Sequence, residues 1–328
     1  MTSTDEAAPG HRGNRSGDRD LVTWSVLAWA AGYGALRLYW AVAGSPWFPP
    51  LGTDLLVFTG WWSVGLCAAA AATAVALRRA RTWRPALAAT GWAVAGAIVL
   101  ACAVLLPQLV ATLFLQFGPR YDAGALASRS GCLAGAALLA VLTVRYQRRY
   151  RGDCPACARR GGPATGWTAP PRWAVAAGWA AVAGCLTRLG AQVVVGLDTV
   201  SPLPVAVTVG FEVGFLMAGV LLPLALVHGW GRVWPRWVPG LRGRTVPRRL
   251  LLWPAFALAV GLVCYFGVGL GQLAVQTLGG GGTDDGGTGG GAFLWVAMAA
   301  YWVWGAGLGA AAWSYHLRSR TACARCGR

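Results

Sequence analysis

Two Cys-x-x-Cys motifs are the residues of this sequence whose types and spacing point most directly to chemistry. Cys154 and Cys157 follow one long apolar run, and Cys323 and Cys326 follow another near the end of the chain. Each motif presents two thiolates to a metal, and two motifs complete a tetrahedral zinc site with no open position for water. The motifs therefore predict one shared structural zinc ion. A redox or disulfide pair, and cysteines without metal, are the alternatives.

Charged side chains inside apolar runs form the second candidate site. Charge within a membrane span is costly and points to function by default. Glu212 is expected to pair with Arg188, or with Arg37 across the molecule. One interpretation is a buried structural ion pair with a second arginine near the lipid headgroups. The other is a binding site for a small anionic or polar solute.

Two glutamines are the remaining candidates for ligand binding, and the sequence offers no catalytic group. Gln108 and Gln272 could add hydrogen bonds to a site formed by the buried charges, or could simply bond across neighbouring helices. The three histidines all lie on the predicted cytoplasmic edge, so none is available for catalysis within the membrane, and no nucleotide-binding motif is present. We therefore predict no catalytic residue. A membrane enzyme that acts on a lipid or a quinone is the least favoured function.

The composition identifies the kind of protein that must position these residues. Of 328 residues, 56% are hydrophobic and 12% charged, and the net charge of +17 comes from 28 arginines with no lysine. An ordinary soluble domain has roughly 25% charged residues. A nucleic-acid-binding protein with this charge would be polar, and nine cysteines are too sparse for a secreted disulfide scaffold. The chain is therefore expected to be an all-α integral membrane protein.

Eight segments are apolar and long enough, or nearly so, to cross a membrane core about 30 Å thick. If the chain crosses the membrane eight times, 24 of the 28 arginines fall on the same side of the membrane, in loops or in the terminal tails. The four exceptions are Arg37, Arg120, Arg129 and Arg188. The positive-inside rule then places both termini in the cytoplasm, with Arg120 and Arg129 in outer loops. The predicted spans are 22–44, 55–77, 86–107, 130–146, 173–196, 203–228, 250–277 and 292–314. The third could continue beyond Pro107, and the fourth, which is short, could begin earlier, near Ala123.

The two halves of the chain resemble each other. Residues 146–157 align without gaps with residues 315–326, so that Tyr146 matches Tyr315 and the two Cys-x-x-Cys motifs coincide. Four spans in each half require two parallel repeats related by an axis along the membrane normal. The predicted organisation is a disordered cytoplasmic tail, a first four-helix repeat, a cytoplasmic linker and a second repeat, at residues 1–20, 21–158, 159–171 and 172–328.

The basic loop 232–249, which contains two tryptophans and several prolines, is expected to lie on the anionic lipids of the inner leaflet rather than on a nucleic acid. The loop reads WPRWVPGLRGRTVPRR over residues 234–249. With this loop, its arginine-only basic residues and its Ala-, Gly- and Trp-rich spans, the chain resembles uncharacterised multi-pass membrane proteins of high-GC actinobacteria. The resemblance implies a bacterial cytoplasmic membrane and no particular activity.

Two functions stand nearly level on the sequence alone. The first is a non-enzymatic membrane scaffold or sensor whose cytoplasmic tails are held together by the four cysteines. The second is a permease-like transporter of a small anionic or polar solute, with its cavity between the repeats. The lipid bilayer is the expected partner in both cases.

Overall fold

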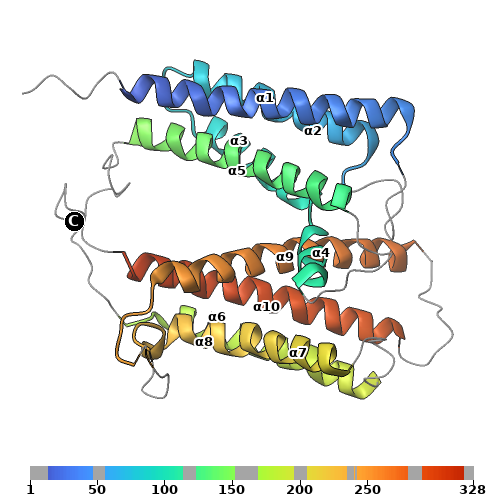
Figure 1. The fold of residues 1–328 in the computed structure, drawn as a ribbon, viewed down its shortest axis with the longest axis vertical. Coiled ribbons are helices and arrows are strands. Elements are labelled where there is room, and N and C mark those ends of the chain that lie inside the picture. The colour runs from blue at the N-terminus through green and yellow to red at the C-terminus, as the bar shows by residue number, and fades with distance from the viewer. Residues whose placement is uncertain are drawn as a thin grey trace, which may run out of the picture. The chain divides into compact units, whose positions relative to one another are not determined.

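The computed structural model is all-helical in the part of the chain that it describes, apart from one isolated antiparallel bridge between Val233 and Thr245. The helices form two compact units, each described here by itself (Figure 1). The described residues are 14–46, 56–113, 123–151, 169–195, 205–234, 240, 242–279 and 290–320.

Unit 1 is a bundle of four helices whose core consists mainly of small and aliphatic side chains. Its first helix packs most extensively against the second, and its third against the fourth. Val26, Ala70, Ala74 and Leu139 are fully buried in this core. The helices of unit 1 are α1 (Asn14–Ala43), α2 (Gly60–Arg79), α3 (Pro85–Ala101) and α5 (Ala123–Arg151).

Unit 2 is organised around its last helix, which packs extensively against both the first and the third long helices. Leu308, Ala311 and Ala312 of this central helix are fully buried. The short helix α4 (Leu105–Leu113), which falls within the predicted first repeat, packs here against α9. The other helices are α6 (Arg172–Val195), α7 (Val205–Leu216), α8 (Leu222–Val227), α9 (Arg248–Leu278) and α10 (Gly290–Arg318).

The predicted sixth span is one apolar stretch with a local change of helix type. A π-helical turn, Met217–Leu221, joins α7 to α8, and the N–H of Leu222 donates to the carbonyl of Met217. Pro223 follows immediately and has no N–H to donate to the preceding turn, so the wider turn lies where the regular ladder is interrupted. Gly219 lies within this turn, where a Cβ would run into Cys185. The turn therefore brings the backbone close to α6.

Six helical stretches in the described part of the chain are long and apolar enough to cross a membrane, which confirms a multi-pass helical membrane protein. Two of the eight predicted spans do not meet these criteria. α1 has 30 residues, but its apolar stretch includes Arg37 and several Trp, Tyr and Gly residues. α3 has 17 residues, or about 26 Å of helix. The qualifying stretches are Gly60–Arg79, Ala123–Arg151, Arg172–Val194, Val209–Val227, Arg248–Leu278 and Gly291–Arg318.

The start of α5 decides between the two boundaries that the sequence left open for the fourth span. The helix begins at Ala123, the earlier of the two, and not at residue 130, which would have left Arg129 in an outer loop. The preceding residues, mostly Ala and Ser, extend the helix by about two turns although they add little hydropathy. Arg129 therefore lies within the helix, and it is buried at 2% exposure.

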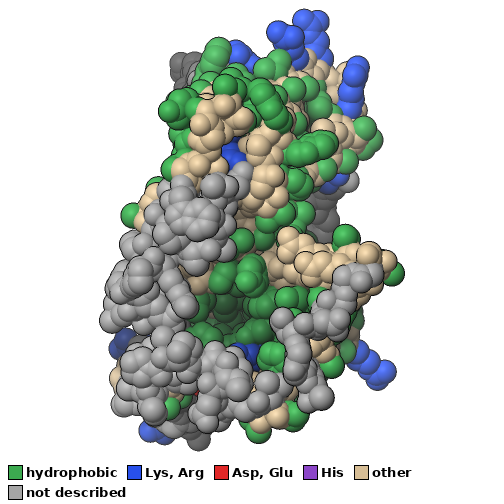
Figure 2. Space-filling model, turned by 90° about the vertical axis from the view of Figure 1, so that its right-hand side faces the viewer, with side chains coloured by type: hydrophobic (Ala, Val, Ile, Leu, Met, Phe, Trp, Pro, Cys, Tyr) green, Lys and Arg blue, Asp and Glu red, His purple; other side chains and the backbone are tan. Residues whose placement is uncertain are grey.

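The outer surface of the described helices suits lipid rather than water. Trp62, Trp253, Val194 and Leu278 are each more than 70% exposed. Hydrophobic side chains cover most of the described surface on the face drawn in Figure 2. Large apolar side chains exposed in such number would cause a soluble protein to aggregate, but they are compatible with hydrocarbon. The exterior is thus consistent with the lipid bilayer as the surroundings of the chain.

Candidate functional sites

Arg188 and Glu212 meet in unit 2, which confirms the pairing that the sequence favoured. Nη1 of Arg188 on α6 lies 3.5 Å from Oε1 of Glu212 on α7. The exposed fractions of the two side chains are 10% and 23%. Strong charge-assisted bonds of this type measure about 2.7–2.9 Å, so the contact is a long ion pair rather than a tight bidentate bond. The pair fixes the second half of α6 against α7.

Aromatic rings enclose the same arginine. The Arg188 Cζ lies 4.7 Å from the centroid of the Phe215 ring and 5.5 Å from that of Tyr301. Phe215 in turn lies edge-on to Trp304, with 4.8 Å between the ring centroids. A guanidinium over the face of an aromatic ring is stabilised by the electrostatic field of the ring. Side chains from α6, α7 and α10 thus surround one buried cation.

Three buried polar atoms near this arginine have no hydrogen-bond partner in the described part of the chain. They are Oε1 of Gln192, Oε2 of Glu212 and Nε1 of Trp304. Gln192 lies one helical turn after Arg188 and is 3% exposed. Buried polar groups are normally satisfied by protein or water, so these atoms could hold water or a small polar molecule. The sequence predictions did not include Gln192. Its i, i+4 spacing from Arg188 could have identified it as a neighbour of that arginine.

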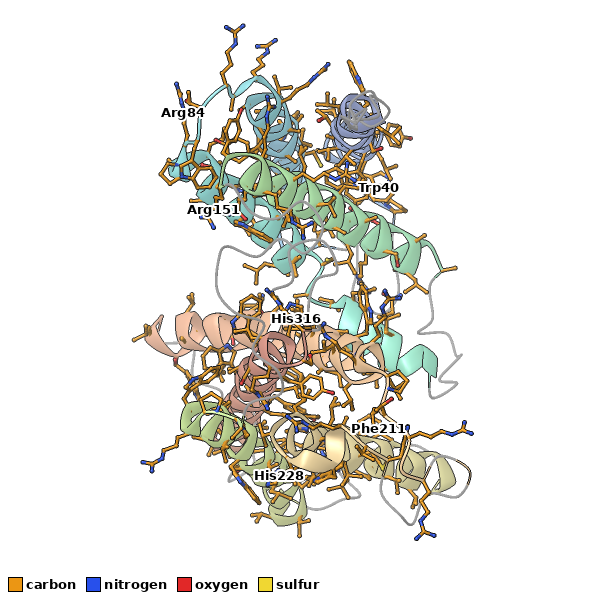
Figure 3. The ribbon with its side chains drawn as sticks, turned by 90° about the vertical axis from the view of Figure 1, so that its left-hand side faces the viewer. Trp40, Arg84, Arg151, Phe211, His228 and His316 are labelled. Atoms are coloured by element: carbon orange, nitrogen blue, oxygen red, sulfur yellow. The ribbon has the colours of Figure 1, made fainter. Side chains whose placement is uncertain are left out.

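Arg37 is buried in unit 1 at 2% exposure. Its Nε donates to the hydroxyl oxygen of Ser63 on α2 at 2.8 Å, and this hydroxyl donates to the carbonyl of Gly60 at 2.6 Å. The Arg37 Cζ also lies 5.5 Å from the centroid of the ring of Trp40, which belongs to the last turn of the same helix and is labelled in Figure 3. The residues around Arg37 therefore hold the end of α1 against the beginning of α2.

The two glutamines predicted to join these charges take different positions. Gln272 is exposed on α9, so the structure does not bring its side chain into the enclosure around Arg188. Gln108 is half-buried on α4, directly after Pro107, and its backbone N–H donates to the carbonyl of Val104 at 3.4 Å. Gln192, rather than Gln272, is the glutamine beside Arg188.

The four cysteines of the two Cys-x-x-Cys motifs, Cys154, Cys157, Cys323 and Cys326, lie outside the described residues, so their zinc site stays a prediction. Among the described residues, no group of three or more His, Cys, Asp and Glu side chains could hold a metal ion. Five further cysteines are described, and four of them are buried among apolar side chains. The buried ones act as small packing residues.

The last helix of each unit carries a tyrosine that fixes a loop of the same unit. The hydroxyl of Tyr146 on α5 accepts from the N–H of Arg84 at 2.8 Å and donates to the carbonyl of Thr82 at 3.1 Å. Both partners belong to the connection between α2 and α3. The hydroxyl of Tyr315 on α10 donates to the carbonyl of Gly231 at 3.2 Å, in the connection between α8 and α9. The two tyrosines are the ones that the sequence alignment pairs.

Basic and aromatic residues gather around the first of these anchors. The Arg151 Cζ lies 4.7 Å from the centroid of the Trp83 ring, and that ring stacks on Tyr146 at 5.5 Å. Figure 3 shows Arg84 and Arg151 at one end of unit 1. This end therefore combines arginines with interfacial aromatic rings, as expected where a membrane protein meets anionic headgroups.

Comparisons with known proteins supply no further assignment. No protein-family model matches the chain, and no curated protein and no solved structure matches it either.

Proposed function

We propose that this chain is an internally duplicated, non-enzymatic scaffold or sensor of a bacterial cytoplasmic membrane. It crosses the membrane eight times as two parallel four-helix repeats, with both termini in the cytoplasm. Cys154, Cys157, Cys323 and Cys326 bind one structural zinc ion, which joins the ends of the two repeats. The arginine-rich loops lie against anionic lipids of the inner leaflet.

The observation that carries this proposal is the pair of matched tyrosine anchors. Tyr146 and Tyr315 each tie the last helix of a unit to the connection between its second and third spans. Cys154 and Cys323 each follow their tyrosine by eight residues. In two parallel repeats, the cysteine segments would therefore start from equivalent points on the same membrane face.

Contacts at both ends of α1 support its inclusion among the spans. The Arg78 Cζ, at the end of α2, lies 5.2 Å from the centroid of the Trp24 ring near the start of α1. Arg37 and Ser63 join the opposite ends of the same two helices. α1 thus runs antiparallel along the length of α2, so a membrane crossed by α2 is also crossed by α1.

Similar contacts support α3 as a span. The ring of Trp83, just before α3, stacks on Tyr146 near the end of α5. Near the opposite end of α3, Sγ of Cys132 in the first half of α5 lies 3.6 Å from the carbonyl oxygen of Ile98. α3 therefore follows α5 through most of the hydrocarbon region.

The zinc site is tested by metal analysis of the purified full-length chain. We expect one zinc ion per chain, and we expect Cys154→Ser and Cys323→Ser each to lower this stoichiometry severalfold. Cys264→Ser, which removes a cysteine of α9 outside the motifs, is the matched control and should leave the zinc content unchanged. A wild-type protein without zinc would contradict the proposed site, as would full zinc content in both motif variants.

A polar-solute transporter is a second candidate, and the unsatisfied buried atoms around Arg188 favour it. Oε1 of Gln192 and Oε2 of Glu212 can accept hydrogen bonds, and Nε1 of Trp304 can donate one. Proteoliposomes loaded with labelled chloride, phosphate or acetate distinguish the two functions. A transporter predicts protein-dependent efflux that Arg188→Gln abolishes. The scaffold predicts efflux no faster than from liposomes without protein.

A further inference from the structure

A cluster of hydrogen-bond donors lies where the beginning of α9 meets the end of α10. Nη2 of Arg248 lies 2.7 Å from Nδ1 of His316, and Nη2 of Arg320 lies 3.0 Å from Nε2 of the same ring. Arg248 also donates to the backbone carbonyls of His316 and Ser319, at 3.3 and 3.4 Å. Figure 3 labels His316 at this end of unit 2.

The imidazole of His316 cannot satisfy both of its guanidinium neighbours. A guanidinium only donates hydrogen bonds, whereas a neutral imidazole has one lone pair and one N–H on its two nitrogens. One of the two contacts therefore opposes a donor to a donor, and protonation of the ring would leave no acceptor at all. The guanidinium groups of Arg248 and Arg320 thus offer the ring more hydrogen-bond donors than it can accept.

A cavity of about 350 Å³ opens beside this cluster, and we call it the His316 pocket. Its lining is mostly apolar, with two arginines and a histidine among the lining residues. The first turn of α9 contributes two arginines, and backbone N–H groups at a helix start favour an anion and disfavour cations. The pocket is lined by Arg248, Arg249, Leu252, Trp253, Phe256 and His316.

The apolar part of the lining continues onto the lipid-facing surface. The side chain of Trp253 is 73% exposed, and that of the neighbouring Leu250 is 53% exposed. Within the pocket, the ring of Phe256 lies edge-on to His316, with 6.4 Å between centroids. A ligand with an anionic head and an apolar chain would therefore find donors for its head and a hydrocarbon surface for its chain.

We propose that the His316 pocket binds a phosphoryl group, carried by a lipid whose chains lie along Trp253. Phosphoryl oxygens can accept hydrogen bonds from Arg248 and Arg249 in the pocket lining, and their charge compensates these two arginines at the start of α9. The inference rests on the membrane placement proposed above but not on the zinc site.

Binding is measured with the full-length protein in detergent and a chelator, so that neither zinc nor the charge of a membrane surface contributes. The probes are water-soluble dihexanoyl phosphatidic acid, its phosphatidylcholine counterpart and inorganic phosphate. We expect saturable binding of the phosphatidic acid and at least tenfold weaker binding of the phosphatidylcholine. Equal affinity for inorganic phosphate would keep the phosphoryl site but identify its ligand as free phosphate. Equal affinity for the phosphatidylcholine, or no saturable binding, would overturn the proposal.

Two arginine variants distinguish binding in the His316 pocket from general electrostatic attraction between the basic protein and an anionic lipid. Arg249 lines the pocket, whereas Arg242 is exposed in the preceding basic loop. We expect Arg249→Gln to weaken binding of the phosphatidic acid about fivefold and Arg242→Gln to change it less than twofold. Equal weakening by both variants would show diffuse electrostatics and overturn the pocket. Loss of zinc with intact lipid binding would refute only the zinc site.

Discussion

Unit 1 and unit 2 each bury an arginine near the end of their first long helix, but they stabilise it differently. Unit 1 holds Arg37 with the hydroxyl of Ser63 and the ring of Trp40. Unit 2 holds Arg188 with the carboxylate of Glu212 and two aromatic rings. A full counter-charge lies beside Arg188, so an anionic ligand there would have to displace Glu212.

The two units also differ in which helix supplies the bulky side chains. In unit 1 the ring of Trp29 on α1 covers Gly135 on α5, and its Nε1 donates to the carbonyl of Gly131 at 2.7 Å. In unit 2 the arrangement is reversed: the first helix, α6, supplies the glycine, Gly184, and the last helix, α10, supplies the tryptophan that it faces, Trp304. The alignment that pairs Tyr146 with Tyr315 also pairs Gly135 with Trp304.

This exchange of large and small residues explains the difference in helix packing. The bulk of Trp29 limits the approach of α1 to α5, so α1 packs mainly on α2. Gly184 and Gly307 let the backbones of α6 and α10 come close, and these two helices form the most extensive pair of unit 2. One order of helices is thus compatible with two different cores.

The largest effect is expected from removing the counter-charge in unit 2. Glu212→Gln leaves Arg188 buried without a carboxylate and should lower the free energy of unfolding by about 2–3 kcal/mol, because Glu212 is mostly buried. Unfolding in mixed detergent micelles measures this loss. The double variant Arg188→Gln, Glu212→Gln should recover part of it. Strict additivity of the two single variants would mean that the pair is not coupled.

A somewhat smaller loss should follow from Gly184→Ala. Its Cβ would lie 2.6 Å from the carbonyl oxygen of Ala300 and 2.9 Å from the backbone nitrogen of Trp304, so α6 and α10 must separate. We expect a loss of about 2 kcal/mol. Gly190→Ala on the same helix meets no atom within 4 Å and should be neutral or slightly stabilising. Similar results for the two variants would refute the close packing of these helices.

In unit 1 the corresponding test removes a hydroxyl rather than a charge. Ser63→Ala takes away the acceptor of the Arg37 Nε and should cost about 1.5 kcal/mol in the same unfolding assay. Thr90→Ala is the control, because the Thr90 hydroxyl is exposed and bonds only within α3. If Ser63→Ala were as harmless as the control, the hydroxyl would not stabilise Arg37.

The smallest effects should be equal in the two units. Tyr146→Phe and Tyr315→Phe each remove the hydroxyl that anchors a loop, and each should cost about 1 kcal/mol. Tyr265→Phe on α9 should cost less, because the Tyr265 hydroxyl anchors no loop in the described part of the chain, and its ring, which packs edge-on against Phe266, is retained as in the other two variants. A clear loss for only one anchor tyrosine would weaken the case for two equivalent repeats.

The features set by local composition could be predicted from the sequence. Apolar runs gave the multi-pass helical class, and the partnership of Arg188 with Glu212 followed from the rarity of acids inside spans. The position of Arg129 was only partly predictable. The apolar residues alone begin its span at residue 130, and the small residues before them allowed a start near Ala123 without deciding for it.

Packing across long sequence separations was also beyond the sequence. Trp29 meets Gly135 more than a hundred residues along the chain, and no local pattern pairs them. The His316 pocket likewise joins the start of α9 to the end of α10. Its arginines were assigned only to a basic loop on the inner leaflet, because sequence spacing does not reveal which side chains converge on one ring.

The sidedness of the two repeat ends tests the proposed architecture most directly. A protease site is inserted after Arg160 in one version of the full-length chain and after Arg328 in another. Each version is then treated with protease in sealed right-side-out and inverted vesicles. Two parallel repeats with cytoplasmic ends predict cleavage of both sites in inverted vesicles and of neither in right-side-out vesicles. Cleavage of the two sites from opposite sides would contradict the parallel duplication and, with it, a shared zinc site.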